Sequence, residues 1–476
     1  MRIVAIDQGT TSTRALAVET DGSCRVVHSE RHEQHHPGAG RVEHDGEELV
    51  ANIRRCLAAA GKADVIGIDN QGESCLAWDA QTKRPISPVI VWQDARTSDQ
   101  VERLKSDGAE TLTLTRAGLP LDPYFSATKL RWLLDHAEGA RDLAQAGRLR
   151  LGTTDAFFLN RLTGTCATDI TTASRTSLMN LETGNWDPEL CQLFGVPGEC
   201  LPEIRPTVGS FGEIDGVPVA ASMVDQQAAL YGHGCRAAGD VKITFGTGAF
   251  ALGVTGERIV RLPERGLLPT VAWQIGPKRS YAVDGGVYNA GSAVDWALRL
   301  GLAPDLAALD SFDRPPAIER SLAFVPALSG LACPHWDRSA AGLWIGMGLE
   351  TDARDMLQAL LEGIALRTAE VIEAMGAALP IGAPVSVDGG LVRSDYFVRF
   401  LASCLGRSLV VRTFDELTAF GCAGLAAAAG GRSLTVPREG ERVIEPVTDG
   451  AAWRARFGEA VSRAKGWRHA APVRPG

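Results

Sequence analysis

The sequence lacks both the long apolar segment and the basic excess that would point to a membrane or to nucleic acid. Crossing a bilayer takes a run of about 18 apolar residues, and no such run occurs in the 476 residues. Lys and Arg number 48 against 57 Asp and Glu, which gives a formal net charge of −9. General nucleic-acid binders carry a basic excess instead. We therefore expect neither a membrane span nor a nucleic-acid partner.

Several chemical motifs are missing as well. The ten cysteines form no CxxC pair, so zinc ribbons and thioredoxin-like sites are not expected. The chain has no Walker A motif, no GxGxxG after a strand and no GxSxG, which argues against P-loop, dinucleotide-binding and α/β-hydrolase proteins. The apolar stretch that ends at Asp7 is too short for a signal peptide. We expect a cytoplasmic protein with reduced cysteines.

Short strands alternate with amphipathic helices along the chain, which predicts an α/β architecture. The expected strands are 2–7, 14–18, 64–69, 88–92, 218–221 and 385–388, and the expected helices are 46–60, 127–136, 353–376 and 395–405. The first two strands form a hairpin with a Gly/Thr tip, and residues 241–254 repeat that scheme about half the chain later. The repeat suggests two similar domains, each opening with a hairpin.

The tips of both hairpins are suited to phosphate. In DQGTTSTR (residues 7–14), glycine allows close approach of an anion, hydroxyl and N–H groups can donate to it, and Arg14 adds charge. Asp7, at the end of a buried strand, could hold Mg²⁺. The segments GTG (246–248) and DGG (388–390) could bind the same phosphate chain from the second of the two domains. Ordinary turns are the alternative for all three segments.

Two further groups of residues have both a functional and a structural interpretation. Asp225 opens a helix after a strand, where it could act as a general base or simply cap the helix. Trp92, Tyr124 and Phe250 could line a small-molecule pocket or belong to the core.

Five of the nine histidines lie between residues 28 and 44. Their spacing fits no common metal site, and the segment is polar. We expect a solvated surface loop there.

The order of these pieces resembles the FGGY carbohydrate kinases, and within them the glycerol-kinase branch, from Arg2 to about Trp467. YFSATKLRWLLDH at 124–136 fits one family signature, and 342–362 fits the second except at Leu360. Branch-like phrases are VWQDART (91–97), LDPYFS (121–126), ASRT (173–176) and FVPA (324–327).

The resemblance implies two actin/hexokinase-like (ribonuclease H-like) ATPase domains with a cleft between them, an N-terminal one at 1–238 and a C-terminal one at 239–476. It also implies phosphorylation of a small polyol by MgATP, with glycerol the first candidate. A larger polyol or a ketose (erythritol, threitol, xylulose, ribulose) is the alternative substrate. A catalytically silent nucleotide- or sugar-binding regulator is the remote alternative. The oligomeric state, a homodimer included, stays open.

The resemblance also assigns roles to individual positions. Asp225 would be the catalytic base, and Asp7 would lie near Mg²⁺. The polyol pocket would contain Glu73, Tyr124, Asp225 and Gln226, with Trp92 and Phe250 as its apolar wall. ATP or ADP would be bound by Thr10, Thr11, Ser12, Arg14, Thr247, Gly248, Gly291, Asp295, Gly390 and Ser394.

Three positions depart from the glycerol-kinase pattern. Gly72 stands where that branch has an Arg directly before the pocket Glu. Loss of a charge-assisted hydrogen bond, worth roughly 1.5–3 kcal/mol, should weaken glycerol binding roughly ten- to a hundred-fold and should open room for a longer substrate. On the nucleotide side, Asp295 replaces Gln and Ser394 replaces Asn.

Overall fold

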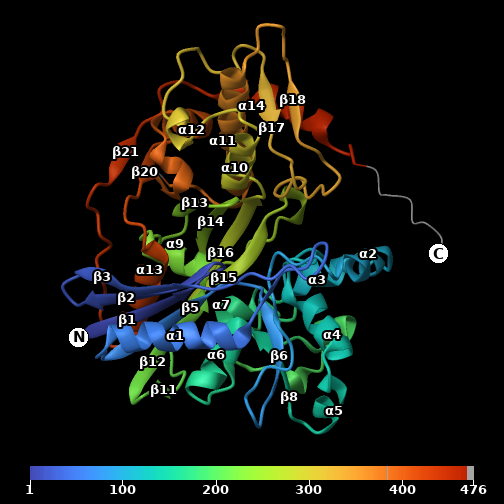
Figure 1. Cartoon of the computed structure of the whole chain (residues 1–476), viewed down its shortest axis with the longest axis vertical. Helices are drawn as coiled ribbons and strands as arrows, with labels where there is room; N and C mark the ends of the chain where they lie inside the picture. The colour runs from blue at the N-terminus through green and yellow to red at the C-terminus, as the bar shows by residue number, and fades with distance from the viewer. Residues whose placement is uncertain (383, 469–476) are drawn as a thin grey trace.

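Two mixed β-sheets, one below the other in Figure 1, form the framework of the computed structural model, which describes residues 1–382 and 384–468. The first sheet has six strands in the order β11-β12-β5-β1-β2-β3. Strands β1, β2 and β3 are antiparallel neighbours, whereas β5 and β12 run parallel to β1. The bounds are β1 (Arg2–Gln8), β2 (Ser12–Glu19), β3 (Cys24–Arg31), β5 (Val65–Asn70), β11 (Glu213–Ile214) and β12 (Val217–Val224).

The second sheet repeats this plan, as the hairpin repeat in the sequence predicted. Its seven strands have the order β15-β16-β14-β13-β19-β20-β21. The hairpin β13–β14 is antiparallel and β19 runs parallel to β13, just as β5 runs parallel to β1. The bounds are β13 (Val241–Phe245), β14 (Ala249–Gly256), β15 (Leu268–Ile275), β16 (Lys278–Val287), β19 (Val385–Gly389), β20 (Leu409–Val411) and β21 (Arg442–Ile444).

Smaller sheets and helices surround these two sheets. The short strands are β4 (Glu43–His44), β6 (Cys75–Asp79), β7 (Val89–Ile90), β8 (Leu149–Thr153), β9 (Ala167–Asp169), β10 (Glu203–Arg205), β17 (Ala323–Val325) and β18 (Leu343–Ile345). The first eight helices are α1 (Gly46–Ala60), α2 (Ser98–Ser106), α3 (Glu110–Arg116), α4 (Ser126–His136), α5 (Ala140–Gln145), α6 (Thr154–Leu162), α7 (Ile170–Ala173) and α8 (Pro188–Phe194). They are followed by α9 (Asp225–Gly232), α10 (Gly291–Arg299), α11 (Ala353–Ala378), α12 (Asp395–Leu405), α13 (Leu417–Ala429) and α14 (Ala451–Ala464).

The predicted helices are confirmed, because apolar spacing and capping agree. Helix α1 begins where the Asp45 side chain accepts a hydrogen bond from the Glu47 amide, and it buries Leu49 and Ile53 against the sheet. The strand predicted at 88–92 is wrong beyond Val89 and Ile90. Its continuation fails because the Trp92 amide donates to the Ser74 hydroxyl and not to a neighbouring strand.

Helices α9 and α13 cross between the two sheets and connect them (Figure 1). The backbones of the two helices are in close contact at two glycines. A Cβ on Gly232 would lie 1.8 Å from the Leu417 carbonyl oxygen. A Cβ on Gly421 would lie 1.9 Å from the Ala228 carbonyl oxygen. Helix α13 belongs to the C-terminal half of the chain, yet it packs against β1 and β5 of the first sheet. The packing of α13 against α9 and the first sheet therefore fixes the position of α9, whose first residue is Asp225.

The histidine-rich segment is less exposed than expected. His28 lies on β3, and His44 on β4 is completely buried, with its Nδ1 3.3 Å from Gln71 Nε2. His32 contacts the backbone oxygen of Thr10 at 2.8 Å. The prediction of a solvated loop is wrong for His44, because neighbouring strands enclose its ring.

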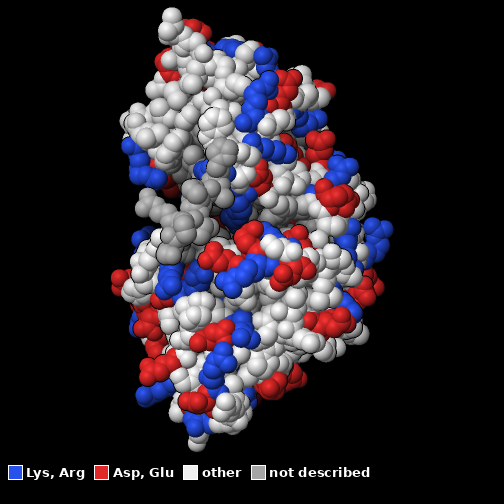
Figure 2. Space-filling view, turned by 90° about the vertical axis from the view of Figure 1, so that its right-hand side faces the viewer, with Lys and Arg blue, Asp and Glu red and all other residues white. Residues whose placement is uncertain are grey.

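Surface charge is mixed on the face drawn in Figure 2, where acidic and basic side chains are interspersed. Within the part of the chain that the structure describes, no helix has the length and apolar character needed to cross a membrane.

Candidate active site

A cavity of about 100 Å³ draws its walls from both halves of the chain. All six side chains predicted for a substrate pocket line it, namely Glu73, Trp92, Tyr124, Asp225, Gln226 and Phe250. Thr10 of the first hairpin tip reaches it as well. The other lining residues are Gly72, Arg175, Val224, Gln227, Leu252 and Asp284.

The aromatic residues Trp92, Tyr124 and Phe250 are half-buried and line this cavity. The rings of Trp92 and Tyr124 meet edge to face, with centroids 5.5 Å apart. The indole Nε1 of Trp92 donates to the Thr10 hydroxyl at 3.0 Å, which fixes the wall to the first hairpin tip. The pocket interpretation of these aromatics is therefore the one that the geometry favours.

Asp225 is the first residue of α9, directly after β12, and its carboxylate accepts from the Gln226 amide at 2.6 Å. The N-cap of α9 is Val224, so the capping interpretation of Asp225 is wrong. Burial raises the pKa of Asp225 to about 7, and the charges of Asp7 and Glu73 add to the shift. A carboxylate with a pKa near neutrality is suited to general-base work at physiological pH.

The half-buried Asp7 lies beside a buried carboxylate, Asp69, that the sequence reasoning missed. Asp7 on β1 and Asp69 on β5 are paired in register across parallel strands. Burial raises the pKa of both carboxyl groups, and the Asp7 charge further raises that of Asp69. Neither Asp69 carboxylate oxygen has a hydrogen-bond partner within residues 1–382 and 384–468. The only signal in the sequence was an Asp near the end of the buried strand VIGIDN.

The first hairpin tip is held as a tight turn. The Gly9 amide donates to the Ser12 carbonyl at 3.0 Å, and His32 braces Thr10 and Thr11 through their carbonyl oxygens. Arg14 forms an ion pair with Glu416 at 3.1 Å. The predicted phosphate-loop residues Thr10, Thr11, Ser12 and Arg14 thus share one tip, with Thr10 opening into the cavity.

The second tip is built against the start of α10. The amides of Ala290 and Ser292 each donate to the Thr247 carbonyl at 3.0 Å. A Cβ on Gly248 would lie 2.6 Å from the Val287 carbonyl oxygen, and one on Gly291 would lie 2.6 Å from that of Gly246. Only glycine fits this close approach, so the structure brings Thr247, Gly248 and Gly291 together as one unit.

The remaining predicted nucleotide positions differ in exposure. Asp295 on α10 and Gly390 after β19 are exposed. Ser394 is the N-cap of α12, and its hydroxyl accepts from the Phe397 amide and donates to the Leu309 carbonyl. That hydroxyl is therefore committed to the helix cap. Nucleotide contacts of these three residues stay a prediction.

Lys242 is a second residue that the sequence reasoning missed. From β13 its buried ammonium group donates to the Gln226 side-chain oxygen at 2.7 Å and to the Thr244 hydroxyl at 3.0 Å. His233 at the end of α9 lies 3.2 Å from Asp388, which begins the predicted DGG loop. The second sheet thus orients the substrate-side residue Gln226.

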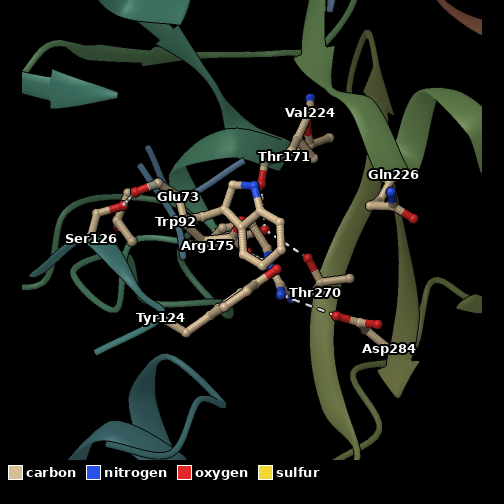
Figure 3. Close-up of polar contacts among 12 residues, drawn as sticks. Glu73, Trp92, Tyr124, Ser126, Thr171, Arg175, Val224, Gln226, Thr270 and Asp284 are labelled. Atoms are coloured by element: carbon tan, nitrogen blue, oxygen red, sulfur yellow. Dashed lines mark hydrogen bonds and ion pairs between the residues drawn. The ribbon is translucent and has the colours of Figure 1, made fainter. Parts of the chain in front are cut away.

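Arg175 and Asp284 complete the pocket, and neither was predicted to lie there. The Arg175 Nε donates to Glu73 at 2.6 Å, and its Nη2 lies 3.0 Å from Asp284 on β16 (Figure 3). Arg175 belongs to the ASRT phrase at 173–176, which carried the resemblance without suggesting a role.

The space next to Gly72 is occupied. A Cβ on Gly72 would lie 2.7 Å from Val224 Cγ2. The expectation that glycine opens room for a longer substrate is therefore wrong at this point, because Val224 takes that room.

Comparisons with known proteins agree with this geometry. Residues 2–232 match the N-terminal domain, and residues 241–430 the C-terminal domain, of the FGGY family of carbohydrate kinases. The chain is 41% identical to a glycerol kinase of Trichlorobacter lovleyi, with 98% of this chain and 99% of that protein covered. A glycerol kinase of Thermus brockianus is 40% identical, again with 98% of this chain and 99% of that protein covered.

Solved structures of similar proteins span the whole fold. A Plasmodium falciparum glycerol kinase with ADP superposes with a TM-score of 0.86 at 29% identity, covering 97% of this chain and 98% of that one. A ligand-bound xylulose kinase of Lactobacillus acidophilus has a TM-score of 0.84 at 21% identity, covering 97% and 96%.

Proposed function

The chain belongs to the FGGY family of carbohydrate kinases, and we propose that its cavity binds glycerol and that MgATP phosphorylates it to glycerol 3-phosphate. The chain is a phosphotransferase enzyme with the two-domain actin/hexokinase-like fold. One observation carries the substrate proposal: the carboxylates of Glu73 and Asp225 and several hydrogen-bonding side chains line a cavity of only about 100 Å³. Pockets for drug-sized ligands hold about 300–1,000 Å³, so this one favours a very small polyol. Relatives about 40% identical over nearly their whole length are named glycerol kinases, which supports the same choice.

In the proposed reaction, a substrate hydroxyl attacks the γ-phosphoryl group of ATP. Asp225 accepts the hydroxyl proton as the new O–P bond forms and ADP leaves. Glu73 and Gln226 orient the substrate through its hydroxyl groups, and Trp92 and Phe250 pack against its carbon chain. Because this chemistry depends on positioning and charge neutralisation, the enzyme needs no covalent intermediate.

The two hairpin tips would hold the phosphates of ATP from opposite sides. The first tip offers the hydroxyls of Thr10, Thr11 and Ser12, and the second offers Thr247. Mg²⁺, when bound, neutralises phosphate charge. It is usually held by one or two carboxylates together with substrate phosphates. The half-buried Asp7 and the buried Asp69 fit that pattern, because the Asp69 oxygens have no hydrogen-bond partner among the described residues.

Closure of the cleft would complete the site, because Asp225 lies in the first proposed domain (1–238) and Thr247 in the second (239–476). A closed cleft also excludes water that could hydrolyse ATP. The free state of all ten cysteines fits a cytoplasmic enzyme. A homodimer stays a prediction, which light scattering of the purified protein would test.

We expect kcat/KM for glycerol to rise with pH and to level off near neutrality. Asp225 accepts a proton only when ionised, and burial raises its pKa to about 7. Below that pH the ionised fraction, and with it the rate, falls about tenfold per pH unit. Bound cations favour the ionised form of Asp225, so they would lower its pKa and move the rise of kcat/KM to lower pH. The measurement is an ADP-release assay between about pH 5 and 8.5 at saturating MgATP. A rate that falls with rising pH across this range would contradict the role of Asp225.

Glycerol is expected to give the highest kcat/KM among small polyols and ketoses. The panel is glycerol, erythritol, D-threitol, D-xylulose, D-ribulose and dihydroxyacetone, each with MgATP. Because the cavity has a volume of only about 100 Å³, we expect four- and five-carbon substrates to react at least about tenfold less efficiently. A clear preference for a four- or five-carbon substrate would overturn the glycerol proposal.

A further inference from the structure

Arg175 has a donor that no protein group satisfies. Its side chain is only 5% exposed, and its Nε and Nη2 pair with Glu73 and Asp284. The third nitrogen, Nη1, is buried and has no hydrogen-bond partner anywhere in the described residues. Buried polar groups almost always have a partner, so a cationic N–H group without one in a cavity wall is free to donate to a molecule bound there.

The guanidinium group is held rigidly in the cavity wall. Glu73 comes from the first half of the chain and Asp284 from the second, so the cation is fixed from both sides of the cavity (Figure 3). The Arg175 guanidinium carbon also lies 5.6 Å from the centre of the Phe125 ring. Glu73 is itself held by the Ser126 hydroxyl, which donates to its backbone oxygen at 2.9 Å. A planar, permanently charged group fixed in this way is an oriented donor for a hydroxyl oxygen.

An arginine at position 72 would require Val224 to move. Any side chain there would begin 2.7 Å from Val224 Cγ2, so Gly72 and Val224 close that part of the wall with apolar surface. Among the described residues that line the cavity, Arg175 is the only Lys or Arg.

We propose that Arg175 binds the polyol directly, through Nη1 to a substrate hydroxyl, in a cavity that has no arginine at position 72. The proposal deepens the proposed function and rests on it. Arg175 is a specificity-determining residue because only a substrate with an oxygen within reach of Nη1 gains the additional hydrogen bond. Its bond to Asp284 also links substrate binding to contact between the two halves of the chain.

The test compares glycerol with its two deoxy analogues, 1,2-propanediol and 1,3-propanediol. In Arg175→Gln, kcat/KM for glycerol should fall roughly 10–100-fold, as expected for one charge-assisted hydrogen bond. For the analogue that lacks the hydroxyl bound by Arg175, wild type and variant should differ by less than about threefold. KM for ATP should stay unchanged. Equal losses for all three substrates would overturn the proposal, because a purely structural arginine does not distinguish among them.

Two further variants keep the test decisive. Arg175→Lys retains the charge, so it covers the case in which Arg175→Gln does not fold, and it should show the same selectivity with a smaller loss. Arg96→Gln is the matched control, because Arg96 is also buried between two carboxylates, Asp94 and Glu43, but lies outside the cavity. It should lower thermal stability without changing the ratio of glycerol to analogue. Selectivity loss in Arg96→Gln equal to that in the Arg175 variants would count against the proposal.

The wall formed by Gly72 and Val224 gives an independent check. Gly72→Ala alone should raise KM for glycerol, because its Cβ pushes Val224 toward the substrate, and Val224→Ala in the same chain should largely reverse that effect. Failure of the proposed function is seen separately, in the wild type: if another polyol of the panel is preferred, the same comparison with that polyol and its deoxy analogues tests Arg175.

Discussion

Replacing Asp225 with Asn is expected to lower kcat for glycerol by about 10²–10⁴-fold, the usual contribution of a positioned general base. The amide has the shape of the carboxylate but cannot take up the proton of the attacking hydroxyl. Nucleotide affinity should change little, since the hairpin tips that would hold the phosphates lie elsewhere. The measurements are single-substrate kinetics and ADP binding by calorimetry. Turnover within about threefold of the wild type would show that another group is the base.

Asp169→Asn is the matched control for this experiment. Burial raises the pKa of Asp169 to about 7, as it does for Asp225. The Asp169 carboxylate, however, caps α7 by accepting from the amides of Thr171 and Thr172 at 2.9 and 2.8 Å. Its loss should reduce stability and leave kcat per folded molecule within about threefold of the wild type. A comparable loss of kcat in both variants would mean that burial of charge, and not proton transfer, explains the effect.

Gly421→Ala is expected to destabilise the protein by at least about 3 kcal/mol, the upper part of the range for overpacking. The added Cβ would lie 1.9 Å from the Ala228 carbonyl oxygen, and because that atom belongs to a helix backbone, α9 and α13 must move apart. The expected result is a melting temperature lower by at least about 3 °C, or insoluble protein. The surviving folded fraction should also have reduced kcat, since α9 begins at Asp225.

Gly376→Ala provides the same chemical change without the clash. A Cβ at Gly376 in α11 would meet no atom within 4 Å. In a helix interior, Ala is favoured over Gly by about 0.5–1 kcal/mol, so this variant should be neutral or slightly more stable. If both variants lower the melting temperature equally, the helix contact is not the cause.

The features that could be predicted from the sequence are those with a local signal. The apolar spacing of α1 and α12, the glycine-containing hairpin tips and the helix-opening Asp225 each depend on residues close together in the chain. Their physical reasons, burial of one helix face and close approach of a backbone, act over a few residues. The α/β architecture followed from the same signals, whereas the two actin/hexokinase-like domains were expected from the family resemblance, and the comparisons confirm that fold.

The features that were missed depend on contacts between distant segments. Arg175 contacts Glu73, which lies 102 residues earlier in the chain, and Asp284, which lies still further away on the C-terminal side. No pattern in the neighbouring residues predicts these contacts. Lys242 reads as one polar residue on a strand, although it is buried against Gln226. The effect of Gly72 was misjudged for the same reason, since Val224, which fills the space, is far away in the chain.

The path of α13 has a consequence for how the enzyme can be divided. A fragment that ended at residue 238 would lack the helix that covers β1 and β5, so the apolar face of Ile3 and Ala5 would be open to solvent. The complementary fragment would carry α13 with no sheet to cover. Neither piece should be stable on its own, but the two produced together should assemble and regain activity, as a split enzyme does. Protease nicking near the boundary should for the same reason leave an active, non-covalent complex.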